Sequence, residues 1–149
     1  MRRHDREMDE QFAYEVFACA PYAVMSFCGT AYGIPVSPAF LNGFVYIHCA
    51  KEGKKLDRIA QDPRVCLCAV SECVPAKNKF TTGFSSAVLF GRAQSVADDA
   101  EKIAALRAIC ERYTPDNMEH FDAAIQKSLA VTEILRISIE KITGKCKKI

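Results

Sequence analysis

The stretch FVYIHCAKEGKKLDRIAQDPRVCLC, residues 44–68, decides the fold of this chain. It opens with β-forming residues at 44–47, and a Gly-Lys-Lys turn follows at 53–55. The residues from Lys54 to Ile59 have a helical pattern, which Asp62-Pro63 ends before a second apolar run begins. The stretch therefore predicts a strand, a short helix and a second strand in close succession.

Lys54 and Lys55 lie in the first turn of the predicted helix. Basic residues at that end oppose the helix macrodipole, which favours negative charge there. A bound phosphate group removes this conflict, because the start of a helix presents free N–H groups to an anion. The alternative interpretation, two solvated lysines on an exposed turn, stays open for a Gly-Lys-Lys motif taken alone.

Composition indicates a soluble protein with one domain over residues 1–149. Hydrophobic residues make up 50% of the chain, enough to bury roughly two thirds of the unfolded surface in one core. Lys plus Arg number 20 against 18 for Asp plus Glu, so no strong field indicates a dedicated nucleic-acid binder. No apolar stretch approaches the roughly 18 to 20 residues that span a bilayer, and the charged start lacks a signal segment. We therefore expect a cytoplasmic protein.

The chain has eight cysteines. A disulfide framework is not expected in a cytosolic protein, and no Cys-x-x-Cys pair or zinc-spaced Cys/His quartet occurs. Cys66 and Cys68 are two apart in an apolar strand, so both project from one face, where a thiol acts as a small hydrophobe. Most cysteines are therefore interpreted as structural, and Cys49, beside His48 at the basic turn, is the exception of interest.

The remaining elements predict a small barrel. Helices are expected at residues 8–19, 54–61, 100–113 and 117–129. Strands are expected at residues 22–28, 32–40, 44–49, 64–73, 84–96 and 131–142. Pro35 and Pro38 place the second of these strands at an edge, a bulge or a strand end, where missing donors often mark a ligand. The fold class is therefore mainly β (α+β), a six-stranded antiparallel barrel with flanking helices.

Several catalytic and nucleotide-binding motifs are absent from the sequence. It contains no G-x-G-x-x-G, no G-x-x-x-x-G-K-[ST] and no G-x-S-x-G. His4, His48 and His120 are not at metal-ligand spacing, so no metal is expected. A lone strand histidine is usually a satisfied polar group, but His48 ends the strand that leads to the two lysines.

Five segments together carry a resemblance to a known family: residues 1–7 (MRRHDRE), 34–36 (IPV), 46–56 (YIHCAKEGKKL), 62–65 (DPRV) and 85–93 (SSAVLFGRA). The third segment is the most specific, and any one alone is weak. Over nearly its whole length the chain resembles the FMN-binding split barrels of the pyridoxamine 5′-phosphate oxidase-related superfamily, and within them the nitroimidazole-resistance (Nim) proteins. The resemblance implies a split β-barrel with FMN as cofactor.

The resemblance also implies where FMN binds. Lys54 and Lys55 match the basic pair that holds its phosphate, and the flavin ring lies along the strand that matches residues 33–37. The other implied cofactor contacts are Ile34, Pro35, Val36, Ser37, Tyr46, Ile47, His48, Cys49, Ala50, Ser85 and Ser86. His48, whose charge changes near neutral pH, is the candidate catalytic residue, and we expect it to donate a proton to the reduced substrate or to contact the substrate directly.

The family comparison favours one branch of function. Pyridoxamine phosphate oxidases commonly have an Arg-Lys pair and a glutamine where this chain has Lys54-Lys55 and Ser86, and their substrate-binding arginines near the C-terminus are missing. The resemblance therefore implies a Nim-like, FMN-dependent reductase of nitroaromatic or other small electron acceptors. Related split barrels are homodimers with a flavin at each interface site, which implies a second copy of this chain as partner.

Other functions stay open on sequence alone. A pyridoxamine-phosphate-oxidase-like oxidase is one, and a non-catalytic member that binds flavin, haem or an F420-type cofactor is another, with His48 as the candidate axial ligand of a haem. An oligonucleotide-binding barrel is a third, motivated by basic residues at both ends of the chain. Its aromatic residues lie in apolar runs rather than between lysines and arginines, so core packing explains them more simply.

Overall fold

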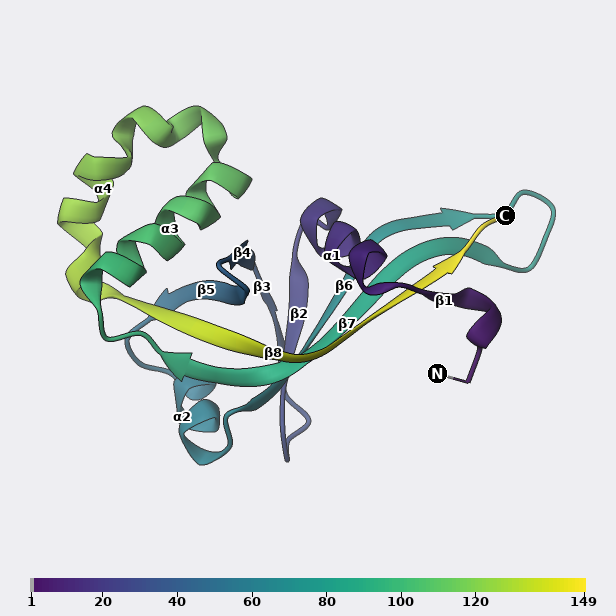
Figure 1. Cartoon of the computed structure of the whole chain (residues 1–149), viewed down its shortest axis with the longest axis horizontal. Helices are drawn as coiled ribbons and strands as arrows, with labels where there is room; N and C mark the ends of the chain where they lie inside the picture. The colour runs from purple at the N-terminus through teal and green to yellow at the C-terminus, as the bar shows by residue number, and fades with distance from the viewer. Residues whose placement is uncertain (1) are drawn as a thin grey trace.

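The structure, a computed structural model, describes residues 2–149 as a curled antiparallel sheet with four α-helices around it (Figure 1). The strands are β1 (Glu7–Met8), β2 (Ala23–Phe27), β3 (Gly33–Val36), β4 (Ala39–Leu41), β5 (Phe44–Ala50), β6 (Arg64–Pro75), β7 (Thr82–Ser95) and β8 (Thr132–Lys147). The helices are α1 (Glu10–Cys19), α2 (Lys54–Gln61), α3 (Asp99–Tyr113) and α4 (Phe121–Ser128). Short 3-10 turns are η1 (His4–Arg6), η2 (Pro115–His120) and η3 (Leu129–Val131).

The strand order explains why the sheet curls. It runs β3-β2-β6-β7-β8-β5-β4, with β1 beside β8. β3 and β4 are thus the two ends of the sheet, yet only Ser37 and Pro38 separate them along the chain. The sheet must bend until its edges meet, and the chain itself closes the barrel at this corner without a hydrogen-bonded ladder between β3 and β4 in residues 2–149. This is the split-barrel fold that the sequence predicts.

The number of strands differs from the prediction of six. The stretch 32–40, expected as one strand, forms both β3 and β4, because the Ser37–Pro38 corner interrupts it and Pro38 has no N–H to donate. The short β1 is an addition, which pairs Glu7 with Lys145 and Met8 with Gly144 of β8. The described part of the chain therefore has eight strands. The helix expected at 117–129 is the turn η2 followed by α4.

Two apolar clusters stabilise the fold, one on each face of the sheet. The barrel interior is filled by fully buried side chains such as Met25, Leu67 and Leu89, and α1 covers it with Phe17. The second cluster lies between α3, α4 and the outer face of β5 and β8, and includes Tyr46, Ile134, Leu106 and Phe121. Adjacent strand residues point to opposite faces, so β5 contributes to both clusters. None of the helices in residues 2–149 has the length and apolarity that crossing a membrane requires.

Arg112 of α3 holds the closing corner in place. Its guanidinium donates hydrogen bonds to the main-chain oxygens of Pro38 and Phe17, and to that of Ala20 at 3.0 Å. The Tyr113 hydroxyl donates to the same Pro38 oxygen at 3.1 Å. Phe17 and Ala20 belong to the end of α1, where helix carbonyls have no partner within the helix. One side chain therefore connects α1, α3 and the corner between β3 and β4.

Replacing Arg112 tests this connection. We expect Arg112→Ala to lower the free energy of unfolding by about 2 to 4 kcal/mol, since three charge-assisted hydrogen bonds are lost and carbonyls are left without donors. Arg107→Lys, on the same helix, is the matched control, because Arg107 makes an exposed ion pair with Asp122, and it should change stability by less than about 0.5 kcal/mol. Equal effects of the two variants in denaturant unfolding would show that the corner is held by other contacts.

Candidate functional site

The start of α2 is open. Gly53 precedes it with a φ of 130°, a conformation that glycine adopts without strain. The Gly53 carbonyl accepts from the N–H groups of Leu56 and Asp57, and no side chain within residues 2–149 caps the helix. The N–H groups of Lys54 and Lys55 are therefore the ones left to face an external anion.

The two lysines have different surroundings. The Lys54 ammonium lies 4.3 Å from the centre of the Tyr32 ring, which itself stacks on Phe27 at 5.2 Å. Tyr32 immediately precedes β3, so this cation–π contact joins the start of α2 to the edge of the barrel. Lys55 is half-buried. Neither ammonium is paired with a carboxylate in the described part of the chain.

Lys55 lies close enough to His48 and Cys49 to affect their ionisation. Burial of part of the ring lowers the pKa of His48, and the positive charge of Lys55 lowers it further, although much of the ring stays open to solvent. Burial raises the pKa of the Cys49 thiol, an effect that Lys55 opposes and the carboxylate of Glu133 reinforces. We call the start of α2 with the end of β5, which together carry Lys54, Lys55, His48 and Cys49, the lysine corner. At neutral pH the lysine corner thus holds an uncharged imidazole and an uncharged thiol beside an ammonium that no carboxylate of residues 2–149 pairs.

Tyr46 lies away from this corner. Its side chain is 3% exposed and points into the cluster beneath α3, where its hydroxyl donates to Glu101 at 2.8 Å. Arg136 donates to the same carboxylate oxygen at 3.0 Å and packs over the Phe44 ring. Burial, and then the Glu101 carboxylate, raises the pKa of Tyr46. The Tyr46 hydroxyl is therefore hydrogen-bonded to Glu101 and does not face the start of α2. Its neighbour Ile47 points to the other face of the sheet and packs in the barrel core.

The predicted flavin-ring contacts lie on β3. Ile34, Pro35 and Val36 pair with β2 on one side, while the other edge of β3 has no strand beside it in residues 2–149. Ser37 begins the closing corner, next to the buried Pro38. Pro35 is exposed, Ile34 is half-buried and Val36 is buried, so this stretch offers an edge of main chain to a ligand.

Ser85 and Ser86 do not join the lysine corner within one chain. Gly33, beside Tyr32, lies in a row with Ser26, Cys66 and Phe90 across β2, β6 and β7. Ser86 comes four residues before Phe90 on β7, opposite Val70 rather than Cys66, and β2 and β6 lie between β7 and β3. The hydroxyls contact β8 instead, Ser85 at the Cys146 sulfur (3.9 Å) and Ser86 at the Lys145 carbonyl (3.5 Å).

A cavity that the sequence does not predict lies beside Tyr32 and the start of α2. Its volume is about 290 Å³ and its lining consists of Ser26, Phe27, Cys28, Arg64, Val65, Cys66 and Phe90. Phe27 lines this cavity and also supports Tyr32 beneath Lys54, so the cavity and the lysine corner share a wall. Arg64 is fixed by Asp62 at 2.6 Å, and this contact holds the pKa of that carboxyl well below its usual range. No local sequence signal marks the cavity, because the pairing of three strands forms it.

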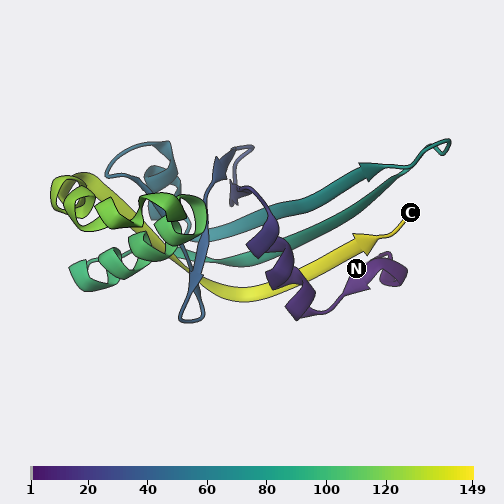
Figure 2. The same cartoon turned by 90° about the horizontal axis from the view of Figure 1, so that it is seen from above.

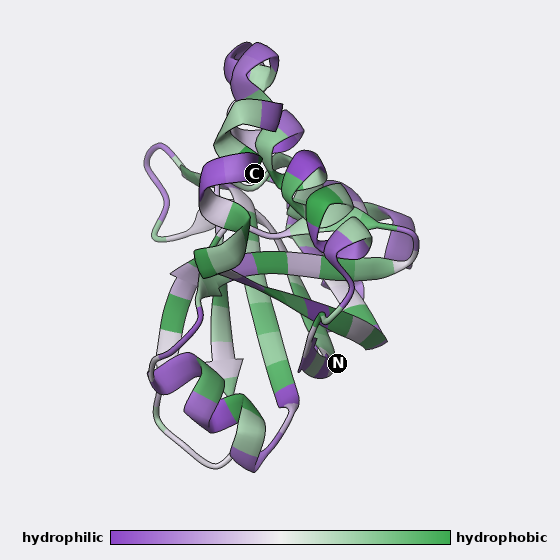
Figure 3. Ribbon diagram, turned by 90° about the vertical axis from the view of Figure 1, so that its left-hand side faces the viewer, coloured by the Kyte–Doolittle hydropathy of each residue, from purple (hydrophilic) through white to green (hydrophobic). Residues whose placement is uncertain are grey.

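The site has no metal-binding arrangement. No group of three or more His, Cys, Asp or Glu side chains in residues 2–149 is placed to hold a metal ion. The eight cysteines are free thiols. Figure 3 shows α2 at the bottom of the view as a largely hydrophilic helix beside strands that carry hydrophobic residues. The start of α2 and the end of β5 bring together two ammonium groups, an imidazole and a thiol, which can bind an anion and exchange protons.

Solved structures share the fold across most of the chain. A flavocytochrome from Azotobacter vinelandii is 20% identical, with a TM-score of 0.81 over 100% of this chain and 72% of that one. An FAD- and haem-binding protein from Mycobacterium smegmatis is 20% identical, with a TM-score of 0.81 over 97% and 74%. A candidate 5-nitroimidazole antibiotic resistance protein from Bacteroides thetaiotaomicron is 20% identical, with a TM-score of 0.76 over 94% and 86%.

Sequence comparison identifies the family. No curated protein matches the chain in sequence. A family profile described as pyridoxamine 5′-phosphate oxidase matches residues 9–146, which include the barrel, the α2 corner and the helices between β7 and β8. The resemblance seen in the sequence is thus confirmed, and the chain belongs to the pyridoxamine 5′-phosphate oxidase family.

Proposed function

We propose that this protein binds FMN at the corner formed by the start of α2, β3 and the end of β5, and reduces small electron acceptors of the nitroaromatic type. One observation carries the proposal: two unpaired ammonium groups lie at an uncapped helix start beside a partly buried imidazole. The similar folds of proteins described as flavocytochrome and as FAD- and haem-binding support a flavin as the anionic ligand.

In this proposal different residues of the lysine corner and of β3 bind different parts of FMN. Lys54 and Lys55, with their own N–H groups, neutralise and hold the terminal phosphate. The Tyr32 ring fixes the Lys54 ammonium, so less side-chain freedom is lost when the phosphate binds. The main chain of β3 and the neighbouring cavity give the ring system an apolar edge to lie against. A flavin, once bound, supplies the hydride or single electrons for reducing an acceptor.

His48 is suited to moving a proton at this site. Its pKa is lowered in the free protein, partly through Lys55, so the imidazole is uncharged at neutral pH. A phosphate dianion on Lys55 cancels that positive charge and raises the pKa of the ring toward neutrality. Binding of the cofactor therefore prepares His48 to donate a proton to the acceptor.

A second copy of the chain completes the site in this proposal. The outer face of β2, β6 and β7 exposes Val24, Val70 and Phe90 at 38%, 46% and 45% of their surfaces. These residues share a face with Cys68, Val88 and Ser86, which gives a broad apolar surface for a monomer. Two copies that pair through this outer face bring Ser86 of one copy closer to the lysine corner of the other, which a single chain keeps apart.

A haem site is the second candidate function. Two of the similar structures are described as a flavocytochrome and as an FAD- and haem-binding protein, and His48 is the histidine nearest to the corner. The imidazole is uncharged at neutral pH and partly open, as an axial ligand must be. A sharp Soret band in the purified protein, in place of flavin absorption, would favour this assignment.

Removing the two lysines tests the binding site. We expect Lys54→Ala with Lys55→Ala to weaken FMN binding by several kcal/mol, from two charge-assisted contacts of about 1.5 to 3 kcal/mol each. Lys51→Ala is the matched control, because Lys51 lies just before the turn and outside the helix start, and it should change the affinity by about 1 kcal/mol or less. Fluorescence titration of FMN measures both. Equal FMN affinity in the double variant and the wild type would remove the assignment.

The pKa of His48 reports on Lys55 and the phosphate. We expect Lys55→Gln to raise the pKa of His48 by removing a positive charge, and FMN to raise it in the wild-type protein but less in the variant. In the free protein the folded-state pKa lies below the unfolded value, so stability falls as the pH drops below about 6.5. NMR titration measures the pKa, with His4 and His120 as internal controls. If the pKa of His48 shifts neither on Lys55→Gln nor on addition of FMN, the phosphate binds elsewhere.

The catalytic role of His48 has a separate test. His48→Gln should leave FMN bound within a few-fold of the wild-type affinity and slow the reduction of a 5-nitroimidazole by about 10²-fold, the lower range for a lost general acid. Single-turnover reaction of the pre-reduced protein measures this step directly. An unchanged rate in the variant would assign His48 to the lining of the site and would leave the flavin-binding proposal intact.

A further inference from the structure

The distal ends of β6, β7 and β8 form an arm that leaves the barrel. Figures 1 and 2 show these strands continuing past α1, away from α3 and α4, to the end of the molecule where both termini lie. We define the arm as residues 2–8, 72–85 and 144–149. At its tip, between β6 and β7, Phe80 is fully exposed, and Lys77 and Lys79 come just before it in sequence. A large apolar side chain in this position lacks any cover within the described part of the chain.

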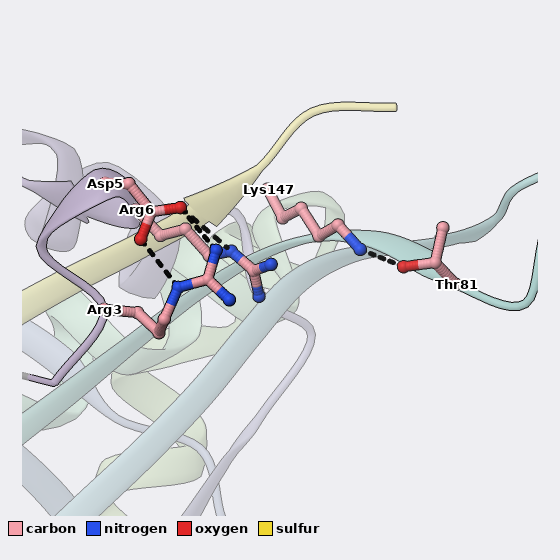
Figure 4. Close-up of polar contacts among 5 residues, drawn as sticks. All are labelled: Arg3, Asp5, Arg6, Thr81 and Lys147. Carbon is pink, nitrogen blue, oxygen red and sulfur yellow. Dashed lines mark hydrogen bonds and ion pairs between the residues drawn. The ribbon is translucent and has the colours of Figure 1, made fainter.

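The arm carries a strong positive charge. It has eight basic residues, Arg2, Arg3, Arg6, Lys77, Lys79, Lys145, Lys147 and Lys148, and three acidic ones, Asp5, Glu7 and Glu72. Arg3 and Arg6 share the single carboxylate of Asp5, at 2.6 and 3.7 Å, and Lys147 donates to the Thr81 hydroxyl (Figure 4). Within residues 2–149 no carboxylate pairs with the two lysines of the tip. The tip therefore presents uncompensated charge around an exposed aromatic ring.

The opposite end of the molecule carries negative charge. The helical insertion between β7 and β8, residues 98–131, has seven acidic residues, Asp98, Asp99, Glu101, Glu111, Asp116, Glu119 and Asp122, against four basic ones, Lys102, Arg107, Arg112 and Lys127. Of the four basic residues, Arg112 donates hydrogen bonds to main-chain carbonyls and Arg107 forms an ion pair with Asp122. Outside the arm and the insertion, basic and acidic residues are equal in number. These two regions therefore account for the net charge of +2 and for its uneven distribution along the molecule.

The insertion also offers an apolar recess. A cavity of about 430 Å³ lies between α3, η2 and α4, and its lining consists of Cys110, Thr114, Asn117, Met118, His120, Phe121 and Ala124. Met118 and Phe121 supply apolar surface, and the exposed Asp116 and Glu119 lie on the same η2 turn. The cavity is large enough for one phenyl ring, and the η2 turn beside it carries two exposed carboxylates, of which that of Glu119 lies 3.3 Å from the His120 ring. Its chemistry complements that of the arm tip.

We propose that Phe80, with Lys77 and Lys79, docks into this recess on a second copy of the chain, so that two copies pair antiparallel. The proposal rests on the homodimer proposed above and adds its orientation and its anchor. A two-fold axis through the outer face of β2, β6 and β7, perpendicular to the long direction of the molecule, places each basic arm at the same end as the other copy's acidic insertion. A parallel arrangement sets arm against arm and insertion against insertion, and like charges then repel.

Charge reversal on each side tests the pairing. The arm variant is Lys77→Glu with Lys79→Glu, and the insertion variant is Asp116→Lys with Glu119→Lys. Each variant alone should raise the dimer dissociation constant at least roughly tenfold in sedimentation at low salt, because both symmetric contacts become repulsive. Glu15→Lys, on the exposed face of α1, is the charge-reversal control and should leave the constant within about twofold.

Mixing the two variants gives the decisive result. The arm variant has an acidic arm tip and an acidic insertion, and the insertion variant has a basic arm tip and a basic insertion, so an equimolar mixture should form a heterodimer with close to wild-type affinity. Phe80→Ser should weaken the wild-type dimer without altering its salt dependence. Two variants that dimerise as the wild type does, or a mixture with no gain in affinity, would overturn the docking.

Two further outcomes separate this proposal from others. If the wild type stays monomeric but binds FMN with Lys54 and Lys55, the flavin site stands and the docking fails. If the arm variant dimerises normally but loses binding to vesicles that contain phosphatidylserine, the arm is a surface for anionic lipid and the docking is wrong. Loss of FMN in the lysine variants bears on the proposed function alone.

Discussion

The closure of the sheet at Ser37 and Pro38 is the constraint on which the rest of the structure depends. The strand order puts β3 and β4 at opposite ends of the sheet, and the chain joins them with two residues, so the barrel has to form. Arg112 and Tyr113 hold that corner through the Pro38 carbonyl, and Arg112 also supplies donors to the end of α1. The same closure sets β3 beside the start of α2, where Tyr32 meets Lys54. The barrel and the candidate site therefore depend on one set of contacts.

Elements that depend on neighbouring residues in the sequence were predicted correctly. The apolar run at 44–47, the glycine before Lys54 and the Asp62-Pro63 stop place β5, α2 and β6 correctly, and the split-barrel fold is confirmed. The stretch 32–40, expected as one strand interrupted by Pro35 and Pro38, forms two strands that divide at Ser37 and Pro38, because this corner is fixed by a helix 70 or more residues away in the chain. The contact of Tyr46 with Glu101 and Arg136, and the cavity at Phe27 and Arg64, also depend on distant pairing. The assignment of each site residue to FMN stays a prediction.

The distribution of polar groups joins the two proposals. Within residues 2–149 no carboxylate pairs with Lys54 or Lys55, and the arm and the insertion carry net charges of opposite sign. The outer face between them is apolar and exposed. In the two proposals a dianionic cofactor covers the first of these features and a second copy covers the others.

Whether the protein binds FMN is decided by the absorption spectrum of the purified protein, together with the mass of the small molecule released from it. We expect two flavin absorption bands, in the near ultraviolet and the blue, and the mass of FMN in a ratio of one per chain. Protein that is folded and colourless, and that takes up no FMN when it is added in excess at low salt, would show that the start of α2 is not a flavin site.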